Sequence, residues 1–569
     1  MMRRVPKWEI LELTFYLDRE INNPFTEVSV SAILEYLSGK ESRGREIEMD
    51  GFYDGKEGGR HVWRIRFAPM WEGEWSYRTR SDEKTLDGIT GMFQCMPPVS
   101  SGGLTVNPRF PNWFAREDGS FPVIMNEGWY PHPCNGFDRE YERRDFPQPG
   151  EEDMKIYLQM LADHGVNLVV DIGQLYARQS SVTDIGFRWP WKVVDATNNR
   201  FDRERFNLEY YRRTDRMMRF AVEHGIFFVM ELLYDNSVVR PDEWSHHPVN
   251  RANGGWLQGN EYGTGWGVMF DLDNREHVKY MERYIKYTVA RYSAFRNLLW
   301  GIGSEIGNLL CVDEEVLPHA AYPVEKAADW YLHWGDYVAR KDPHGRLRSL
   351  GDTGRLMQMV CGPHNNFNIT QDPRSNYYPM GDLEACFRAM NRFGEDFWHY
   401  GRPTVVGEMT AGTVGAYDAE RRLYWTGFVS GIYMGRADRH FGPVISGELM
   451  ESRLFGFEGA PVIYEDMKRM SQFLTENRVK FWRMRPDDRL LIGVGDEDMI
   501  YCLAADNEEY VVYFVRGGKA GLELPASICR WFNPRNGTYR ESLETSPGLH
   551  TFTAPDEQDW VLHVVSRYG

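Results

Sequence analysis

Short apolar runs alternate with helical patterns along the middle of the chain, from about residue 123 to residue 476. The runs are rich in β-branched and aromatic residues, which predicts buried strands, and the segments between them repeat apolar residues every three or four positions, which predicts helices. We expect strands near 123–125, 167–171, 226–231, 297–305, 347–350, 366–369, 403–408 and 435–444, and helices near 151–164, 203–223, 276–292, 325–340, 383–400, 420–433 and 462–476.

Repeated strand–helix units of this kind form a parallel sheet, and eight of them close into a barrel. The sequence therefore predicts an α/β protein whose main domain is a (β/α)8 TIM barrel. A doubly wound open sheet is the alternative arrangement of the same units.

Two of the expected strands end in glycine followed by glutamate. The first is the stretch from Trp300 to Glu305, and the second ends at Gly407 and Glu408. Counting strands along the chain places Glu305 after the fourth and Glu408 after the seventh. Barrel enzymes carry their catalytic groups at the carboxyl ends of the strands. Two carboxylates facing one pocket predict the hydrolysis of glycosidic bonds.

The regions on either side of this middle part are rich in strand patterns. Residues 27–34 and 62–67 alternate with period two, a Pro-, Gly- and Ser-rich stretch follows at 95–103, and strand patterns return at 499–504 and 510–515. We expect an N-terminal β-sandwich at 1–100, the catalytic barrel at 101–484 and a C-terminal β-sandwich at 485–569. The sandwiches could bind carbohydrate or mediate oligomers, and packing against the barrel is the preferred interpretation.

The composition excludes several functions. With 66 basic and 83 acidic residues the net charge is −17, which is unfavourable for binding nucleic acid or an anionic membrane. The seven cysteines are scattered and odd in number, which suits a reducing compartment. No apolar segment is long enough for a signal peptide or a membrane span. We expect a cytoplasmic protein acting on small substrates, and the sequence leaves a homo-oligomer open.

Short motifs in all three regions resemble one known family. They are 51–55 (GFYDG), 66–69 (RFAP), 73–75 (GEW), 114–119, Gly128-Trp129, and 531–539, where Trp, Pro, Gly and Tyr recur at fixed spacing. In this order the chain resembles apiosidase-like glycoside hydrolases of the retaining (β/α)8 clan. The resemblance implies a covalent intermediate, with Glu408 as nucleophile and Glu305 as acid/base. One departure is Ser304, which stands where the clan usually has an Asn that binds a substrate hydroxyl.

Further polar and aromatic residues near the expected strand ends are candidates for substrate binding. Each could instead brace the barrel mouth or pack in a loop. Trp256 and Trp266 are included because the Gly-rich loop at 253–267 is too polar for a core. The candidates are Trp129, Tyr130, His132, Asp171, Tyr176, Arg178, Glu231, Trp256, Trp266, Ser304, His364 and Gln371. His246-His247 lacks carboxylate or Cys partners at ligand spacing, so we expect no metal site and no cofactor.

Three functions fit these features. The first is an exo-acting retaining glycosidase that hydrolyses a small oligosaccharide or glycoside. The second is a carbohydrate-binding protein that keeps the barrel without catalysis, which Ser304 favours and the intact glutamate pair opposes. The third is a transglycosylase, which would use the same residues as the first.

Overall fold

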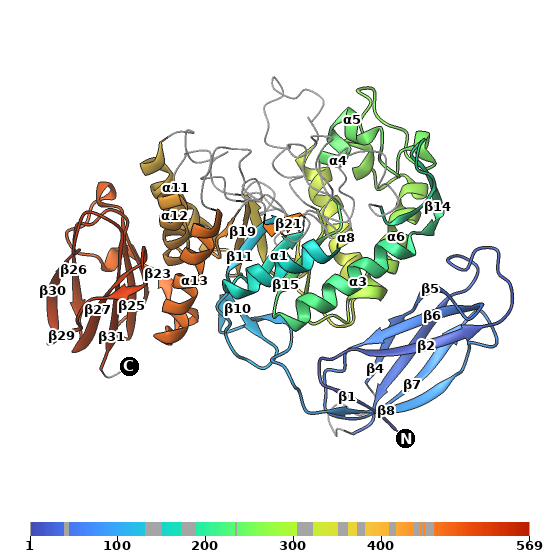
Figure 1. Ribbon diagram of the computed structural model, residues 1–569, viewed down its shortest axis with the longest axis horizontal. Helices are drawn as coiled ribbons and strands as arrows, with labels where there is room; N and C mark the ends of the chain where they lie inside the picture. Colours follow the sequence, from blue (N-terminus) through green and yellow to red (C-terminus); the bar gives the residue numbers. More distant parts are fainter. Residues whose placement is uncertain are drawn as a thin grey trace.

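The computed structural model describes residues 2–38, 45–130, 151–171, 189–233, 236–303, 323–350, 362–371, 382–408, 417–436, 444–445, 448–449 and 460–567. Three parts follow one another along the chain (Figure 1). Strand-rich parts at the two ends flank a central part in which helices surround parallel strands. In the described ranges no helix has the length and apolar character that crossing a lipid bilayer requires.

The first part, here called the N-terminal sheet pair, encloses a core of its own. One sheet has the strand order β1-β8-β7-β3-β4 and the other β2-β6-β5. Alternating side chains of both sheets point inward, and Ala32, Leu34, Ile65, Phe67 and Trp75 are almost fully buried between them. The strands are β1 (Arg3–Pro6), β2 (Leu11–Leu17), β3 (Val30–Tyr36), β4 (Glu46–Asp50), β5 (Phe52–Glu57), β6 (Arg60–Phe67), β7 (Gly73–Ser81) and β8 (Thr90–Met96).

Eight parallel strands form the centre of the molecule and are here called the strand ring. A hairpin of β9 (Leu104–Asn107) and β10 (Phe110–Arg116) leads into it. The ring strands are β11 (Asn126–Tyr130), β12 (Leu168–Asp171), β15 (Phe227–Glu231), β16 (Leu298–Gly301), β17 (Arg348–Ser349), β18 (Asn368–Gln371), β19 (Thr404–Glu408) and β20 (Gly435–Arg436).

Hydrogen bonds connect these strands in chain order and return to the first. One sheet has the order β17-β16-β15-β12-β11-β20, and β18 pairs with β19. The backbone N–H of Asn366, two residues before β18, donates to the carbonyl of Arg348 in β17 (2.8 Å). The N–H of Val406 in β19 donates to the carbonyl of Tyr433, two residues before β20 (2.9 Å). Every strand therefore has a neighbour on both sides.

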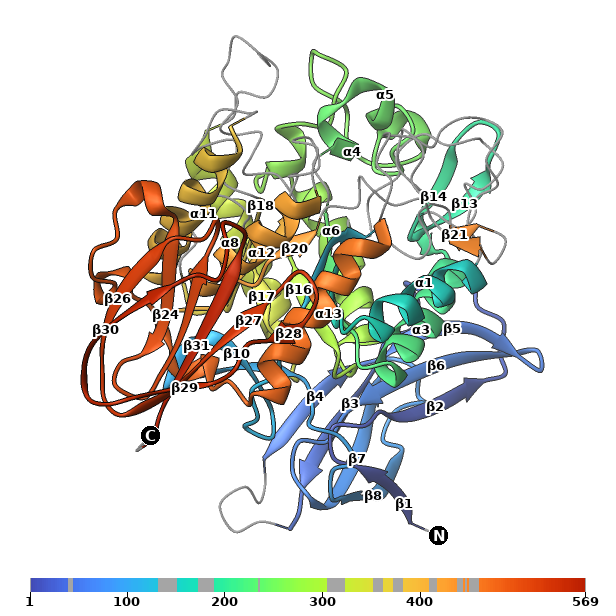
Figure 2. The same cartoon turned by 60° about the vertical axis from the view of Figure 1, so that its left-hand side comes forward.

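Amphipathic helices cover the outside of the ring, mostly within a few residues of the predicted bounds (Figures 1 and 2). Asn207, Asn274 and Asp382 cap three of them, because each side chain accepts a hydrogen bond from the N–H three residues later. The helices are α1 (Glu151–Asp163), α3 (Leu208–Glu223), α6 (Arg275–Tyr292), α8 (Val324–Lys341), α11 (Leu383–Trp398), α12 (Tyr417–Val429) and α13 (Ala460–Glu476).

Several predicted elements were wrong in their bounds; the strand expected at 297–305, for example, ends at Gly301. The helix expected from residue 203 begins only at Leu208, because Asn207 caps it and the preceding residues pair as the hairpin of β13 (Trp191–Asp195) and β14 (Arg200–Phe206). The strand expected at 123–125 begins instead at Asn126. Other short elements of this part are α4 (Asn236–Val239), α5 (Pro241–Trp244), β21 (Val444–Ile445) and β22 (Glu448–Leu449).

The last part, here called the C-terminal sheet pair, docks on α12 and α13 (Figure 2). Arg421 of α12 donates two hydrogen bonds of 3.0 Å to the buried carboxylate of Asp559, and Tyr513 donates a third (3.2 Å). The strands are β23 (Arg485–Pro486), β24 (Ile500–Ala505), β25 (Glu509–Phe514), β26 (Lys519–Leu524), β27 (Ser527–Asn533), β28 (Thr538–Tyr539), β29 (Leu543–Thr545), β30 (Gly548–Thr553) and β31 (Trp560–Ser566).

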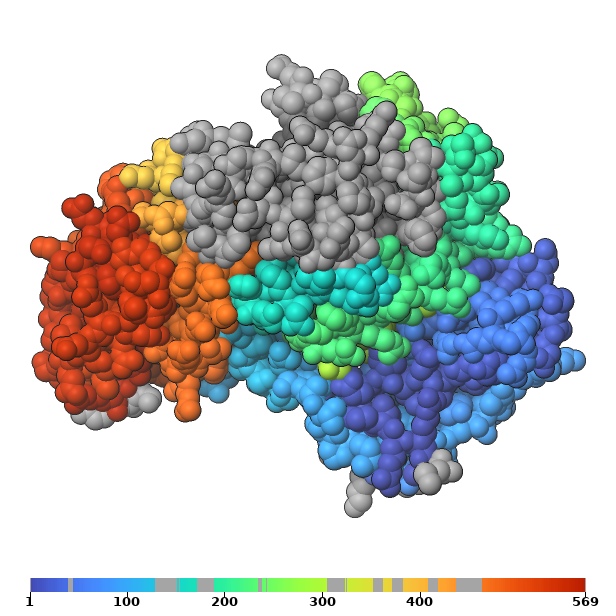
Figure 3. Space-filling view, viewed as in Figure 1, coloured from blue at the N-terminus to red at the C-terminus, as the bar shows by residue number. Residues whose placement is uncertain are grey.

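A buried charge cluster joins the N-terminal sheet pair to the helices of the ring, over the broad contact visible in Figure 3. Asp215 of α3 accepts two hydrogen bonds from Arg66 of β6 (2.9 and 2.7 Å) and two from Arg291 of α6 (3.1 and 2.7 Å). Arg291 also donates to Asp54 of β5 (3.1 Å). Burial alone would raise the pKa of Asp215, but the charges of Arg291 and Arg66 outweigh it and hold the pKa well below its ordinary value.

We predict that Asp215→Asn lowers the free energy of unfolding by roughly 3–5 kcal/mol, because it leaves two buried guanidinium groups without their shared carboxylate. Urea unfolding at neutral pH measures the difference. Asp18→Asn is the matched control, since that carboxylate is 83% exposed and lies 3.9 Å from Arg60. Because the pKa of Asp215 is lowered, its contribution should be present above about pH 4 and decrease on acidification. Equal stability of the two variants would contradict the prediction.

A second carboxylate, Asp488, should make stability depend on pH in the opposite direction. It accepts hydrogen bonds from the N–H of Cys502 (2.6 Å) and the amide of Asn391 (3.0 Å), between the C-terminal sheet pair and α11. Burial, together with nearby Glu395 and Asp487, raises its pKa to about 7. The folded protein therefore holds a proton that the unfolded chain releases near pH 4.

We predict that the wild type loses stability relative to Asp488→Asn as the pH rises from about 4 to 7, by at most about 1.4 kcal/mol per pH unit, with no further loss above pH 8. Unfolding midpoints of both proteins across that range measure the difference. A constant difference at every pH would show that Asp488 has an ordinary pKa.

Candidate active site

The carboxyl ends of the ring strands bring six of the predicted site residues to one rim: Trp129, Tyr130, Asp171, Glu231, Gln371 and Glu408. Because the strands are parallel, their last residues share one end of the ring. The register places Tyr130 level with Asp171, Glu231 level with Gly301, and Gln371 level with Glu408. This end is here called the carboxyl rim, and it faces away from the N-terminal sheet pair (Figure 1).

Glu408 is the last residue of the seventh ring strand, as the strand count predicted. The fourth strand ends at Gly301, so that Glu305 follows it by four residues and lies outside the described residues. Ser304, His132, Tyr176 and Arg178 also lie outside them. The backbones of Glu408, Trp129, Tyr130, Asp171 and Gln371 are described and their side chains are not. The roles of these residues stay predictions.

Glu231 is the rim carboxylate whose surroundings the structure describes. It ends β15 and is 1% exposed. A Cβ atom on Gly301 would lie only 2.6 Å from Cγ of Glu231 and 3.3 Å from its Oε1. Gly301 therefore has to be glycine for the Glu231 side chain to lie against the end of β16, where the chain continues toward Glu305. This explains one glycine of the motif on which the sequence analysis depends.

Asn126 is a buried polar residue of the ring that the sequence analysis missed. Its amide donates to the carbonyl of Val406 (2.8 Å), two residues before Glu408, and so connects β11 to β19 across the intervening β20. A Cβ atom on Gly435 of β20 would overlap both partners of this bond. Asn126 and Gly435 thus hold the strand that carries Glu408. The sequence signal was a polar pair, Asn126-Glu127, directly after an apolar run.

Trp256 and Trp266 lie in the Gly-rich loop at 253–267, but their side chains belong to the core, which that loop was predicted to be too polar to join. They are 1% and 2% exposed and belong to the main hydrophobic core. The Trp256 indole stacks on Tyr280 at 4.6 Å and donates to Nδ1 of His277 (3.1 Å), whose pKa burial lowers to about 4. Trp266 packs edge-on against Phe270. Buried indoles of this kind stabilise the core, which favours packing over substrate contact.

His364 lies at the wrong end of the ring for a substrate-binding residue. It precedes β18 by four positions, so it belongs to the amino end of the strands. Its Nε2 lies 3.2 Å from Oδ1 of Asp336 on α8, and both side chains are more than 40% exposed. This position argues against substrate contact by His364, because the carboxyl rim is at the opposite end. In the described ranges, no group of three or more His, Cys, Asp or Glu side chains is placed to hold a metal ion.

Comparison with known families supports the interpretation of the central part. Residues 146–344 match the family "Apiosidase-like, catalytic domain". The matched segment includes Glu231 and Glu305 and ends before Glu408. The resemblance to apiosidase-like glycoside hydrolases is confirmed. Residues 4–82 match a domain of unknown function (DUF5060), and residues 486–565 match the family described as "Putative collagen-binding domain of a collagenase". No curated protein matches the chain significantly.

Solved structures with this fold include glycoside hydrolases. One, described as "a putative glycoside hydrolase from Bacteroides vulgatus ATCC 8482", is 16% identical, with a TM-score of 0.66 over 99% of this chain and 100% of that chain. A glycoside hydrolase family 5 structure from the same organism is 15% identical, with a TM-score of 0.56 over 82% of this chain and 94% of that chain. At these identities the likeness concerns the fold alone.

We predict that Gly435→Ala destabilises the protein by roughly 1–3 kcal/mol, because the added methyl group overlaps the Asn126 amide and the Val406 carbonyl. Urea unfolding measures the loss. Gly495→Ala is the control, since a Cβ there meets only Asp498, at 3.7 Å, an ordinary contact. A Gly435→Ala protein as stable as the control would show that the ring adjusts without cost.

Proposed function

We propose that the protein is a retaining, exo-acting glycosidase that hydrolyses a small oligosaccharide or glycoside. The observation that carries the proposal is the position of Glu408 at the end of the seventh parallel strand, with Glu305 following the fourth. The apiosidase-like match and the fold of the solved glycoside hydrolases support the same reaction class.

In the proposed mechanism, the two carboxyl groups act on opposite sides of the anomeric carbon, about 5–5.5 Å apart. The Glu408 carboxylate attacks that carbon while Glu305 donates a proton to the leaving oxygen, so that the glycosidic bond breaks and a glycosyl ester forms. Glu305 then takes a proton from water, whose oxygen displaces Glu408 from the sugar. Two inversions restore the original configuration.

Glu231 is a positioning residue in this proposal. Its carboxylate lies against the end of β16, on the path of the chain toward Glu305. We propose that Glu231 is an anionic neighbour of Glu305, which disfavours a second negative charge and so favours the protonated form that an acid catalyst needs. Ser304, a shorter hydrogen-bonding residue than the usual Asn, would then meet the substrate hydroxyl next to the reacting carbon.

We also propose that the strand ring is a (β/α)8 barrel at residues 101–484, between β-sandwich domains at 1–100 and 485–569. The two separate hydrophobic cores of the N- and C-terminal sheet pairs support this division. The N-terminal sheet pair contacts the helices around the amino end of the ring, which leaves the carboxyl rim for substrate.

The test is release of nitrophenol from a panel of aryl pyranosides and furanosides by the wild type, Glu408→Ala and Glu305→Ala. We expect one sugar to be cleaved and both variants to lose roughly a thousandfold or more in kcat/KM. Azide should restore turnover of Glu408→Ala and give a glycosyl azide of inverted configuration, because the small anion attacks from the side that the carboxylate occupied.

Glu523→Ala on the exposed face of β26 is the control and should keep full activity. Activity surviving in Glu408→Ala would refute the assignment of the nucleophile. A wild type that cleaves no member of the panel, yet whose melting temperature a sugar raises, would favour the carbohydrate-binding alternative.

A further inference from the structure

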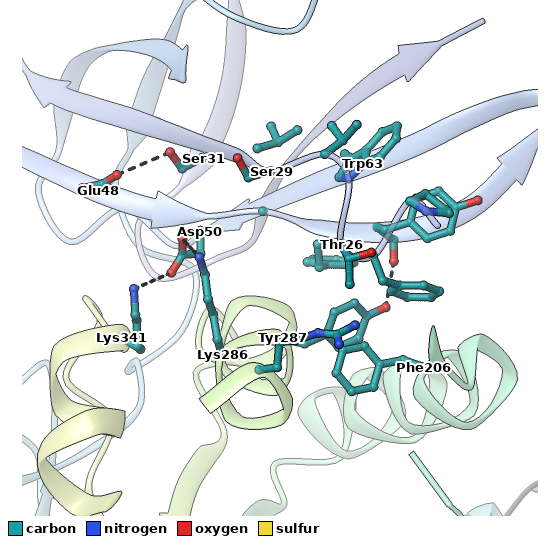
Figure 4. Close-up of a pocket in the computed structure, with 18 of the residues that line it drawn as sticks. Thr26, Ser29, Ser31, Glu48, Asp50, Trp63, Phe206, Lys286, Tyr287 and Lys341 are labelled. Atoms are coloured by element: carbon teal, nitrogen blue, oxygen red, sulfur yellow. Dashed lines mark hydrogen bonds and ion pairs between the residues drawn. The ribbon is translucent and has the colours of Figure 1, made fainter. Parts of the chain in front are cut away.

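A cavity of about 460 Å³ lies between the N-terminal sheet pair and the helices of the strand ring (Figure 4). Residues of the segment 24–31 and of β4, β5 and β6 form one wall, and residues of β14, α6 and α8 form the other. A volume of this size falls in the range of small-molecule sites, which often lie between domains. All of its lining residues are described.

The helical wall of the cavity is cationic. Arg283 and Lys286 reach it from α6, and Arg340 and Lys341 reach it from the last turn of α8. Lys286 and Lys341 share one carboxylate, that of Asp50, at 3.1 and 3.2 Å, as Figure 4 shows.

The cations of this wall outnumber the carboxylates that line the cavity. Arg283 pairs with Glu204, which lies outside the cavity. Among the described residues, Arg340 has no ion pair and lies over the ring of Tyr337. Glu48 is the remaining carboxylate of the lining, and Ser31 donates a hydrogen bond to it (3.4 Å). Four cations therefore line the cavity beside two carboxylates, Asp50 and Glu48, and among the described ion pairs Arg283 alone is paired outside it, in a chain that is otherwise strongly acidic.

The opposite wall presents hydroxyl groups. Thr26, Ser29 and Ser31 line it from the N-terminal sheet pair, and Figure 4 places them across from Lys286 and Tyr287. One end of the cavity is aromatic, with Phe206 and Tyr287 side by side at a ring distance of 4.4 Å. Hydroxyl groups suit the hydroxyls of a sugar, because each can both donate and accept a hydrogen bond.

The cavity is separate from the carboxyl rim. α8 runs back from the end of β16 toward the start of β17, so its last turn, with Arg340 and Lys341, lies at the amino end of the strands. A ligand there would bind beneath the ring, on the side opposite to Glu408.

We propose that this cavity binds a sugar acid. Its carboxylate pairs with Arg340 and Lys286, and its hydroxyls bond to Ser29 and Thr26. The excess positive charge selects an anion, and the hydroxyl-lined wall selects a polyol over a simple anion. The proposal goes beyond the glycosidase activity and does not depend on it.

Isothermal titration calorimetry at low ionic strength tests the proposal, with D-glucuronate, D-glucose and inorganic phosphate as ligands. The wild type should bind glucuronate and show no comparable binding of glucose or phosphate. Arg340→Gln should weaken glucuronate binding about tenfold or more, because it removes a charge-assisted hydrogen bond. Lys286→Met should act in the same direction. Arg340 is exposed and Lys286 is 43% exposed, so both variants should fold, which their unfolding midpoints verify.

Lys326→Gln is the matched control, since it removes an exposed cation near the other end of α8, away from the cavity. Its binding of glucuronate should equal that of the wild type. No binding by the wild type, undiminished binding by Arg340→Gln, or an equal loss in Lys326→Gln would each overturn the proposal. Phosphate binding as tight as that of glucuronate would show an anion site without sugar recognition, and would overturn it too.

Discussion

The carboxylate of Asp215, held by one arginine from each side of a domain contact, fixes how the N-terminal sheet pair lies on the strand ring. Arg66 and Arg291 each donate two hydrogen bonds to it, and all three side chains are buried. Burying charges costs several kcal/mol per ion, and only complete pairing offsets that cost. Apolar contacts would tolerate sliding, whereas two planar guanidinium groups on one carboxylate accept few geometries. The contact is therefore specific as well as stabilising.

Because of this fixed contact, the amino end of the ring is covered by the sheet pair and the carboxyl end is not. At the amino end, the sheet pair covers helices, and its polar contacts are buried, as Arg66 and Asp215 illustrate. The cavity lined by Asp50 and Lys286 exists because the sheet pair is held at one distance from α6. At the carboxyl end, no such cover is needed, and the strand ends carry Glu231 and Glu408. A rigid base beneath the ring keeps the strand ends at the rim in position.

Local patterns predicted the alternation of strands and helices and the place of Glu408, because both depend on periodicity and on the residues that end a strand. Local patterns do not predict contacts between residues that are distant in the sequence. Trp256 looked exposed among glycines and polar residues, yet the loop folds over a core that only tertiary structure supplies. His364 is close to the sixth strand in sequence, but it precedes that strand and so lies at its amino end, away from the rim. The predicted helix at 203–223 starts too early, because Asn207 caps the helix and the residues before it form a strand.

The glycines of the ring show why the site motifs have their form. Neither Gly301 nor Gly435 lies in a turn, and neither has a positive φ. Each leaves room for a side chain from a neighbouring strand, Glu231 in one case and Asn126 in the other. Glycine within a strand weakens it, so its presence indicates that another group must approach the backbone closely. Here that group is polar and buried, which costs free energy unless it is well bonded. Both costs fall in or beside the two strands that lead to Glu305 and Glu408, so the close approach of Glu231 and Asn126 is kept there at the expense of strand stability.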